Sequence, residues 1–542
     1  MIKKNDLIEI TIDSCSVNGS GVGRYEGMAV FIPFVCAGEK VLARVLKVKS
    51  TYAYAKIERI IEPSPHRTEP VCPVYSKCGG CVFAHMDYED ELKIKENHVR
   101  QCLKRIGGCE PVFEPILSTG SFSRYRNKAQ YPLSLTGDEL KIGFFSPRSH
   151  RVVHCPECKL QPSEFEQILK IFEEYICKYG VTVYDEEKHR GLLRHVYVRK
   201  GGATDEIMVC AVINGDSLPY AEKLVGDLTD SNKNIKSVVL NINKEKTNVI
   251  LGGECLTLFG EDYIEDILCS LRFRISPLSF YQVNRDAAQL LYGKAKEYAA
   301  LNGNEVLLDL YCGTGTIGLT MADRVSKLIG VEIVPQAVEN AKTNAVINGI
   351  DNAEFICGDA AAAAQRLKQR GLRPDVVILD PPRKGCDKKL IETVNDMNPD
   401  RIVYISCDAA TLARDCAVFR EFGYEAAKCT PCDMFPRAGH VETVVLLVKL
   451  PPDDVINIKL DISELPVSIH DGNATYPEIR NYVIKKHGLK VSSLNISQIK
   501  RKYGLPVNDS YNKPKSENSR QPQCTPEKEQ AIVDALKYFK MI

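Results

Sequence analysis

Residues 284–449 alternate between helix-like and strand-like segments, and this alternation constrains the fold more than any other feature of the chain. Apolar periodicity predicts helices over 285–300, 316–323 and 335–347, and strands over 305–310, 327–332, 375–379, 401–405 and 441–449. Strands that alternate with helices in this way form a parallel sheet with helices on both faces. The sequence therefore predicts an α/β, Rossmann-like domain in this part of the chain.

The segments on either side of this domain have different patterns. Short alternating strands punctuated by glycines fill residues 1–62 and predict a small antiparallel barrel. A β-rich central region follows, with helices near 87–106 and 162–178, and the first of these is expected to pack on the α/β domain. Beyond Pro451-Pro452 the chain begins strand-like, continues with a helix near 476–487 and a polar segment at 508–526, and ends in a helix that starts at Thr525-Pro526. We expect domains at 1–62, 63–275 and 276–452, and an extension of unknown role at 453–542.

Charge and targeting signals narrow the class of protein. The net charge is +1, but residues 470–542 carry 13 Lys/Arg against 7 Asp/Glu, and residues 1–130 carry 19 against 15. Two mildly basic ends suit a polyanion, although surface solubility explains such an excess equally well. The start of the chain does not resemble a signal peptide, and we find no apolar run long enough to span a membrane. We expect a cytoplasmic, monomeric protein without membrane contact.

A glycine-rich loop follows the first strand of the α/β domain. Gly313-x-Gly315-x-x-Gly318 fits the dinucleotide fingerprint, but Asp309 directly before it would repel a pyrophosphate. S-adenosylmethionine has no phosphate and carries a sulfonium and an ammonium charge, so acidic strand ends suit it. Such acids end four successive strands: Asp309, Glu332, Asp359 and Asp380. The loop, including Gly313, therefore predicts S-adenosylmethionine in preference to NAD.

Two later residues form a reactive pair for methylation at a pyrimidine carbon. C5 of uracil attacks a methyl sulfonium only after a thiolate has added at C6, and a base must then remove the C5 proton. Cys407 follows a strand and can supply the thiolate, and Glu442 begins another strand and can act as the base. Taken singly, the cysteine could be buried filler and the glutamate solvated. Arg383, which follows Asp380-Pro-Pro where amino-group methyltransferases carry an aromatic residue, favours carbon methylation.

Several motifs in series resemble those of the RNA uracil-5-methyltransferases, in particular the bacterial 23S ribosomal RNA enzymes with an N-terminal TRAM domain. They are Asp309-Leu-Tyr-Cys-Gly, Asp380-Pro-Pro-Arg-Lys-Gly385, Ser406-Cys-Asp-Ala-Ala-Thr-Leu-Ala-Arg414, Phe435-Pro-Arg-Ala-Gly-His-Val-Glu442 and Phe280-Tyr-Gln-Val-Asn284. The resemblance covers residues 1–450 and implies Cys407 as nucleophile, Glu442 as base, a TRAM barrel over 5–60, and S-adenosylmethionine contacts from Gln282, Tyr311, Glu332 and Asp380. The chain departs from the pattern at Asp408-Ala409, where the family has Asn-Pro.

A cysteine cluster lies outside the α/β domain. Cys72-x5-Cys78-x2-Cys81 supplies three thiolates in a tight loop, which suits zinc or an iron–sulfur cluster, and the spacing does not separate the two. The family resemblance favours a [4Fe–4S] cluster, with Cys158 as the fourth ligand because it matches the family pattern of Cys, one residue, an aliphatic residue and Gln. Cys155 is the second choice.

RNA contacts are expected from three basic segments. Arg24-Tyr25 lies in the barrel, Arg124-Tyr-Arg-Asn-Lys128 interleaves aromatic and cationic side chains, and Lys500-Arg-Lys502 is either a phosphate contact or a solubilising face. The predicted function is methylation of a uridine C5 in RNA, most consistent with 23S ribosomal RNA. The alternatives are a transfer RNA uracil-5-methyltransferase, a non-catalytic RNA-binding iron–sulfur protein and an NAD enzyme.

Overall fold

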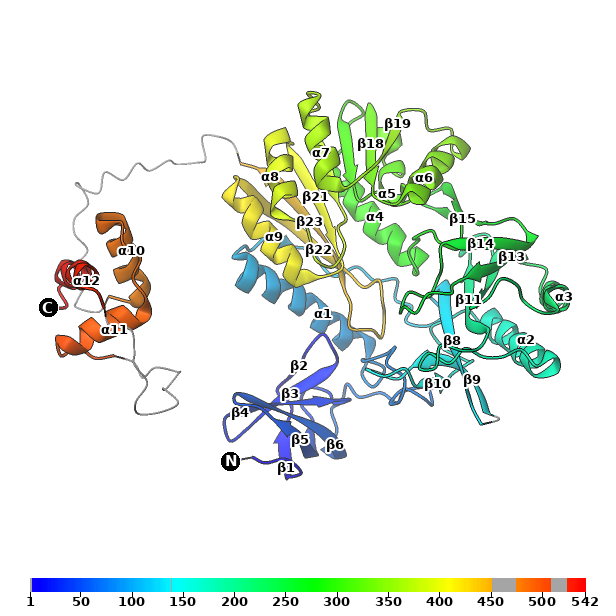
Figure 1. The fold of residues 1–542 in the computed structure, drawn as a ribbon, viewed down its shortest axis with the longest axis horizontal. Helices are drawn as coiled ribbons and strands as arrows, with labels where there is room; N and C mark the ends of the chain where they lie inside the picture. Colours follow the sequence, from blue (N-terminus) through cyan, green and yellow to red (C-terminus); the bar gives the residue numbers. More distant parts are fainter. Residues whose placement is uncertain (1, 138, 451–473, 508–523) are drawn as a thin grey trace. The chain divides into compact units, whose positions relative to one another are not determined.

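The computed structural model describes residues 2–137, 139–450, 474–507 and 524–542. The chain forms two compact units, Met1–Val455 and Ile456–Ile542, and Figure 1 shows the fold of each. The strand-like start predicted after residue 452 and most of the polar segment at 508–526 lie outside the described residues. Within the described ranges, the chain has no helix with both the length and the apolar character needed to cross a membrane.

The N-terminal part of the first unit is a six-stranded sheet in the order β1-β5-β6-β4-β3-β2. Its strands are β1 (Leu7–Thr11), β2 (Ser14–Cys15), β3 (Ser20–Tyr25), β4 (Met28–Pro33), β5 (Lys40–Val48) and β6 (Tyr52–Glu62). All pairings are antiparallel except that of β4 with β6. Alternate residues such as Val30, Val41 and Ala53 are buried in one apolar cluster, as the period-2 pattern predicted.

The central part is built on a seven-stranded sheet in the order β10-β9-β8-β11-β12-β13-β14. Its strands are β8 (Lys128–Thr136), β9 (Glu139–Phe145), β10 (Val152–His154), β11 (Leu193–Lys200), β12 (Ile207–Ile213), β13 (Ile235–Ile242) and β14 (Glu254–Gly260). Helix α2 (Glu164–Tyr179) confirms the helix predicted near 162–178. A second helix, α3 (Ala221–Ser231), was missed because Gly226, Thr229 and Ser231 are weak helix formers. Burial of its Leu224 and Leu228 against the sheet stabilises it instead.

A hairpin of β15 (Ile264–Leu268) and β16 (Leu271–Ile275) leads into the predicted α/β domain. The strands there are β17 (Val306–Leu310), β18 (Lys327–Glu332), β19 (Ala353–Cys357), β20 (Val376–Leu379), β21 (Arg401–Ser406), β22 (Tyr424–Cys432) and β23 (Glu442–Lys449), with β7 (Val112–Phe113) at the edge. Their order is β19-β18-β17-β20-β21-β23-β22-β7. The five strands from β19 to β21 are parallel, as predicted.

The far side of this sheet differs from the prediction. β23 runs antiparallel to both β21 and β22, and β22 itself was not predicted. The sequence of β22, Tyr-Glu-Ala-Ala-Lys-Cys-Thr-Pro-Cys, lacks a clear apolar period, and its burial comes from its neighbours. The helix predicted over 316–323 is only α5 (Thr316–Leu319), because the backbone N–H groups of Thr320 and Met321 donate to the carbonyls three residues back, at Ile317 and Gly318, and the chain tightens into a 3-10 turn over Ala322–Arg324.

Helices cover both faces of the eight-stranded sheet (Figure 1). One face carries α4 (Arg285–Ala299) and α6 (Pro335–Ile347), which confirm the helices predicted there. The other face carries α7 (Ala360–Gln369), α8 (Lys388–Met397) and α9 (Ala409–Glu421). Helix α1 (Tyr88–Cys102), which continues into a π turn over Leu103–Gly107, buries Val99 and Leu103 in the same cluster as α9. A segment far away in the sequence therefore completes the α/β core.

A buried ionic network connects α1 to the segment 433–441 that precedes β23. Lys95 Nζ lies 2.7 Å from Glu91 Oε1 and 2.7 Å from Asp433 Oδ1, and it donates to the carbonyl of Phe435 at 3.1 Å. Arg437 donates from its backbone N–H to Glu91 and from its guanidinium to the carbonyl of Met86. The side chains of Lys95 and Glu91 have no exposed area. This network fixes the path of the segment 433–441.

Replacing Lys95 with alanine should lower the free energy of unfolding of this unit by about 3–5 kcal/mol, because it leaves Asp433 buried without its cation and Glu91 with Arg437 alone. The matched control is Lys93→Ala on the same helix, which removes an exposed ion pair with Asp90 and should cost only about 0–1 kcal/mol. Urea denaturation of the two variants and the parent protein measures both changes. Equal shifts for the two variants would contradict this role of Lys95.

Candidate active site

A cavity of about 670 Å³ opens at the carboxyl ends of the parallel strands. Its lining includes most of the residues predicted from the sequence: Gln282, Tyr311, Gly313, Glu332, Asp359, Asp380, Cys407 and Glu442. These residues come from segments that span more than 150 positions of the chain, and the crossover connections of the sheet bring them to one edge. Among the predicted catalytic and cofactor-binding residues, Asp309 is the one that does not line this cavity.

The glycine-rich loop between β17 and α5 forms the floor of the cavity. Tyr311, Gly313 and Gly315 have φ angles of +69°, +55° and +82°, so three residues of the loop adopt the left-handed conformation before α5 begins. Asp309 lies beneath this loop, where one carboxylate oxygen accepts a hydrogen bond from the backbone N–H of Gly318 at 2.9 Å. Burial raises the pKa of Asp309 to about 8, against the opposing effect of that N–H. Asp309 therefore supports the loop from below, and its direct contact with a cofactor stays a prediction.

The other three acids end successive strands and face the cavity. Glu332 accepts hydrogen bonds from the backbone N–H groups of Gly313 at 3.1 Å and Val334 at 2.9 Å. Asp359 caps α7 by accepting from the N–H of Ala362 at 3.0 Å. Loss of solvation raises the pKa of Asp380, which is partly buried, to about 7. A cation bound among these groups would restore part of that lost solvation energy.

Cys407 and Glu442 meet because β21 and β23 are antiparallel neighbours. Ser406 pairs with Thr443, and continuing this register by one residue sets Cys407 opposite Glu442. Burial, then the charges of Glu442 and Asp380, raise the pKa of Cys407 to about 11. Burial and Asp380 raise the pKa of Glu442 to about 8. The positive charge of Arg383 opposes both shifts.

Among the lining residues that were not predicted as site residues, five carry a cationic or aromatic side chain of interest here: Arg126, Phe280, Arg383, Phe435 and His440. The Arg383 guanidinium lies 3.4 Å from His440 Nε2, and the Arg126 guanidinium lies 5.9 Å from the ring centre of Phe435. Four of the five fall inside or beside the motifs already recognised in the sequence, which was the available signal. Spacing along the chain could not reveal that they share one wall.

The basic run Arg124–Lys128 is divided between different environments. Arg124 pairs with Glu166, and Tyr125 donates from its hydroxyl to the carbonyl of Pro436 at 2.8 Å. Lys128 is buried, and its pKa is lowered to about 8. Only Arg126 in this run lines the main cavity. The Tyr125 hydroxyl is therefore bound within the protein, and the base-stacking role that the interleaved pattern indicated stays a prediction.

The predicted cysteine ligands line a second cavity of about 370 Å³. They are Cys72, Cys78, Cys81, Cys155 and Cys158. The Cys155 thiol donates to Cys158 and lowers the pKa of Cys158, as do the backbone N–H groups of Leu160 and Gln161. This polarity stabilises a thiolate at position 158 rather than at position 155, where the same contact and burial raise the pKa. The next residues along the loop, Val82 and Phe83, donate from their backbone N–H groups to the carbonyl of Arg437.

The spacing of these cysteines is wide. Among the described residues, the group His66, Asp87 and Asp90 is the one that brings three possible metal ligands within 4.8 Å of one another. Zn–S bonds of about 2.3 Å in a tetrahedral site would hold the sulfurs about 3.8 Å apart. No three of these cysteine sulfurs therefore lie as close together as the ligands of a single zinc ion would.

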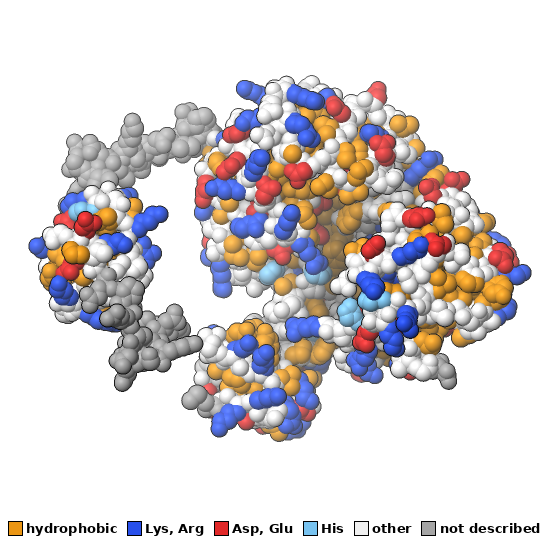
Figure 2. All heavy atoms as spheres, in the orientation of Figure 1, with side chains coloured by type: hydrophobic (Ala, Val, Ile, Leu, Met, Phe, Trp, Pro, Cys, Tyr) orange, Lys and Arg blue, Asp and Glu red, His pale blue; other side chains and the backbone are white. Residues whose placement is uncertain are grey.

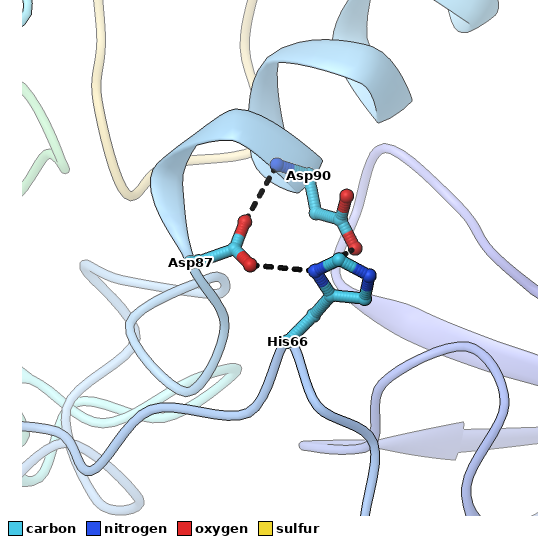
Figure 3. A group of neighbouring side chains, drawn as sticks. All are labelled: His66, Asp87 and Asp90. Carbon is cyan, nitrogen blue, oxygen red and sulfur yellow. Dashed lines mark hydrogen bonds and ion pairs between the residues drawn. The ribbon is translucent and has the colours of Figure 1, made fainter.

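The group of His66, Asp87 and Asp90 has a simpler explanation. Figure 3 shows His66 pointing at both carboxylates, with its Nδ1 2.7 Å from Asp87 and 3.4 Å from Asp90. Asp87 is the N-cap of α1 and accepts from the N–H of Asp90 at 2.9 Å (Figure 3). The three side chains thus fasten the start of α1 to the segment that follows β6.

Comparison with known proteins agrees with this arrangement. Residues 216–450 match the family model described as tRNA (uracil-5-)-methyltransferase, and residues 3–57 match the TRAM domain. An uncharacterized RNA methyltransferase of Clostridium tetani is 43% identical over 446 residues, which cover 82% of this chain and 97% of that protein. One from Halalkalibacterium halodurans is 43% identical over 447 residues, covering 82% and 98%. The crystal structure of Pyrococcus abyssi tRNA (uracil-54, C5)-methyltransferase in complex with S-adenosyl-L-homocysteine superposes with a TM-score of 0.65, at 28% identity, over 81% of this chain and 99% of that one.

The reactivity of Cys407 should depend on its charged neighbours. Above pH 9, Glu442→Gln should accelerate alkylation of Cys407 by iodoacetamide about three- to tenfold, because it removes the negative charge that raises the pKa of the thiol. Below pH 7 the variant and the parent protein should react alike, because Glu442 is itself protonated there. Mass spectrometry of the peptide that contains Cys407 gives the rate against pH.

Arg383→Gln is the matched control, because it removes a positive charge from the same surroundings. It should slow the alkylation of Cys407 by raising the pKa of the thiol. Identical pH profiles for the parent protein and both variants would show that these side chains do not influence Cys407.

Proposed function

The chain belongs to the RNA uracil-5-methyltransferase family, and from this premise we propose that it methylates C5 of a uridine in 23S ribosomal RNA through a covalent adduct on Cys407. The family depends on S-adenosylmethionine, and the fold is that of such methyltransferases. The observation that carries the proposal is the register of β21 and β23, which sets a thiol and a carboxyl group opposite each other at the edge of the cavity.

The proposed roles of this pair follow from the chemistry of uracil. The Cys407 thiolate adds to C6, and the electrons of the C5–C6 double bond move into an enolate that makes C5 nucleophilic. S-adenosylmethionine, when bound, supplies the methyl group. Glu442 then takes the proton from C5, the electrons of that C–H bond re-form the double bond, and the C6–S bond breaks to release Cys407. The raised pKa of Glu442, about 8, suits a base that works near neutral pH.

The remaining predicted residues are proposed to hold S-adenosylmethionine. Glu332 is placed for the ribose, Asp359 for a group near the adenine and Asp380 for the cationic part of the molecule. Gln282 and Tyr311 also line the cavity and contribute further contacts. The left-handed turn at Gly313 lets the backbone approach a ligand closely. Asp309 is proposed to act through the loop above it. The residues present therefore fit the donor.

The comparisons and the sequence favour two different RNA substrates. The TRAM domain and the cysteine-lined cavity favour 23S ribosomal RNA through the family resemblance. The alternative is a transfer RNA, favoured by the likeness to the Pyrococcus abyssi enzyme, whose name gives uracil-54 of tRNA. We propose that residues 1–62 bind RNA, that residues 63–275 support the site and that residues 276–452 carry the chemistry. The cytoplasmic location and monomeric state stay predictions.

Trapping on RNA tests both the chemistry and the substrate. Glu442→Gln should transfer the methyl group and then stall, because losing a general base slows its step about 10²–10⁴-fold. It should accumulate a methylated RNA–protein adduct that survives denaturing gels, and 23S ribosomal RNA should carry it when 23S and transfer RNA compete. An adduct on transfer RNA would select the alternative.

Cys407→Ala is the matched control, because it keeps the cavity but lacks the thiol. It should bind RNA and S-adenosylmethionine yet form no covalent species. Normal turnover by Glu442→Gln, or an adduct with Cys407→Ala, would refute the assigned roles.

We also propose a [4Fe–4S] cluster held by Cys72, Cys78, Cys81 and Cys158. The wide spacing of the thiols around a 370 Å³ cavity supports a cluster over a single zinc ion. The polarised contact between Cys155 and Cys158 supports Cys158 as the fourth ligand. Bound there, the cluster would tie together the loop of Cys72–Cys81 and the segment before α2, and it would take no part in methyl transfer.

Cysteine variants test the ligand set. Protein purified without oxygen should be brown from thiolate-to-iron charge transfer, Cys158→Ser should lose this colour, and the matched control Cys155→Ser should keep it. Visible absorption and iron analysis measure the result. Colourless protein with one zinc per chain would contradict the cluster, and the reverse pattern of the two variants would move the ligand to Cys155.

A further inference from the structure

The second unit folds around an apolar core of its own. Its helices are α10 (Tyr476–His487), α11 (Ser493–Lys502) and α12 (Pro526–Tyr538). Ile479, Val483, Ile496, Ile532 and Leu536 are buried between them. The family match ends at residue 450, and the alignment with the Clostridium tetani relative already takes up 97% of that protein. The family assignment therefore says nothing about what this unit does.

The connection between α10 and α11 is a short, capped turn. Gly488 closes α10 in the left-handed conformation, with φ of +66°, and Ser492 opens α11 by accepting from the N–H of Asn495. Only Leu489–Val491 lie between the two caps, and Arg480 donates across the turn to the Ser493 hydroxyl at 2.8 Å. Figure 1 shows the axes of α10 and α11 crossing. Two crossed helices joined by a tight turn with glycine are typical of helix–turn–helix nucleic-acid-binding modules.

The described residues of this unit carry an excess of positive charge. Its described residues hold ten lysines and arginines against four acids. Three of the four acids are already engaged: Asp534 bonds to Lys486 and His487, Glu529 to Lys502, and Glu478 to the Thr475 backbone in the cap of α10. Five exposed cations form no ion pair with the described residues: Lys485, Lys490, Arg501, Lys537 and Lys540. Figure 2 shows lysine and arginine side chains over the visible face of this unit.

Aromatic rings accompany these cations. Tyr503 is 45% exposed and directly follows the basic end of α11, and Tyr538 is 61% exposed at the end of α12. Exposed tyrosines beside unpaired lysines and arginines suit unpaired bases stacked next to phosphates. An acidic protein surface would use the charges but not the rings.

We propose that the described residues of the second unit, 474–507 and 524–542, form a second nucleic-acid-binding site, which holds RNA through Lys485, Lys490 and Arg501 by contacts to the sugar–phosphate backbone. The choice of RNA over DNA rests on the proposed function, because the substrate of the family is RNA. The binding itself does not depend on Cys407 or Glu442. The unit would raise the local concentration of substrate for the first unit without touching the reacting base.

Fluorescence anisotropy with the full chain tests this site. The probes are a labelled RNA stem-loop with a single-stranded tail and the DNA of the same sequence. The triple variant Lys485→Gln, Lys490→Gln, Arg501→Gln should bind the RNA about tenfold more weakly near 0.15 M salt. The slope of log K against log salt should fall by about 2, because each lost phosphate contact removes about 0.7 to 0.9.

The matched control keeps the charges: Lys485→Arg, Lys490→Arg, Arg501→Lys should bind like the parent chain. A chain ending at Pro452 should lose at least as much affinity as the triple variant, which covers the case in which that variant unfolds the unit. Unchanged affinity and salt slope in the triple variant and the truncated chain would overturn the site, and tighter binding of the DNA would overturn the choice of RNA. The two proposals can fail separately. If the variants bind RNA weakly but the parent chain never methylates RNA, the binding site is supported and only the proposed function is refuted.

Discussion

The ion network around Lys95 is the interaction on which the arrangement of the first unit depends. Lys95 lies on α1, outside the α/β domain in sequence, yet it binds Asp433 and the carbonyl of Phe435 in the segment before β23. Arg437 in the same segment accepts from Val82 and Phe83, directly after the cysteine loop. The segment 433–441 therefore contacts α1 and the residues that follow the cysteine loop, and it leads directly into β23, which begins with Glu442. A buried, fully paired cluster of this kind specifies one geometry, because any other would leave charges without partners.

Loss of solvation raises the pKa values of the carboxyl groups in and beneath the main cavity. Asp309, Asp380 and Glu442 have their pKa raised to about 8, about 7 and about 8, chiefly by burial. A carboxyl group with a raised pKa in the folded state costs stability as the pH rises from its ordinary value, near 4, through the raised value, because the unfolded chain ionises first. A cationic ligand reverses this cost by giving the carboxylates a counter-charge. The site is thus unfavourable for phosphates and favourable for a sulfonium, which agrees with the acids recognised in the sequence.

Local sequence rules predicted much of the fold but could not supply the register. The helices α4 and α6 and the strands β17 and β18 follow from clear periodicity and strong boundaries. An all-parallel sheet would have put the start of β23, with Glu442, at the edge opposite to Cys407. Because β23 is antiparallel, its start lies at the same edge as Cys407. The direction of β23 depends on the unpredicted strand β22 and on pairing between residues that are distant in the sequence. Asp309 was grouped with the other acids because strand ends are visible in the sequence, whereas the depth of a side chain beneath a loop is not.

Asp408 stands where the family has asparagine, and it still caps the helix that follows. Asp408 caps α9 by accepting from the N–H groups of Ala410 and Thr411 at 3.1 and 2.9 Å, and Ser406 accepts from its backbone N–H. An asparagine side chain can make the same capping bonds, since both residues present one oxygen to the first turn. The side chain at 408 therefore acts on Cys407 by fixing the turn between β21 and α9. The cap of α9 fixes the turn that carries the Cys407 thiol, and the register of β21 with β23 fixes the strand that carries the Glu442 carboxyl group. Two independent backbone constraints therefore position the two groups.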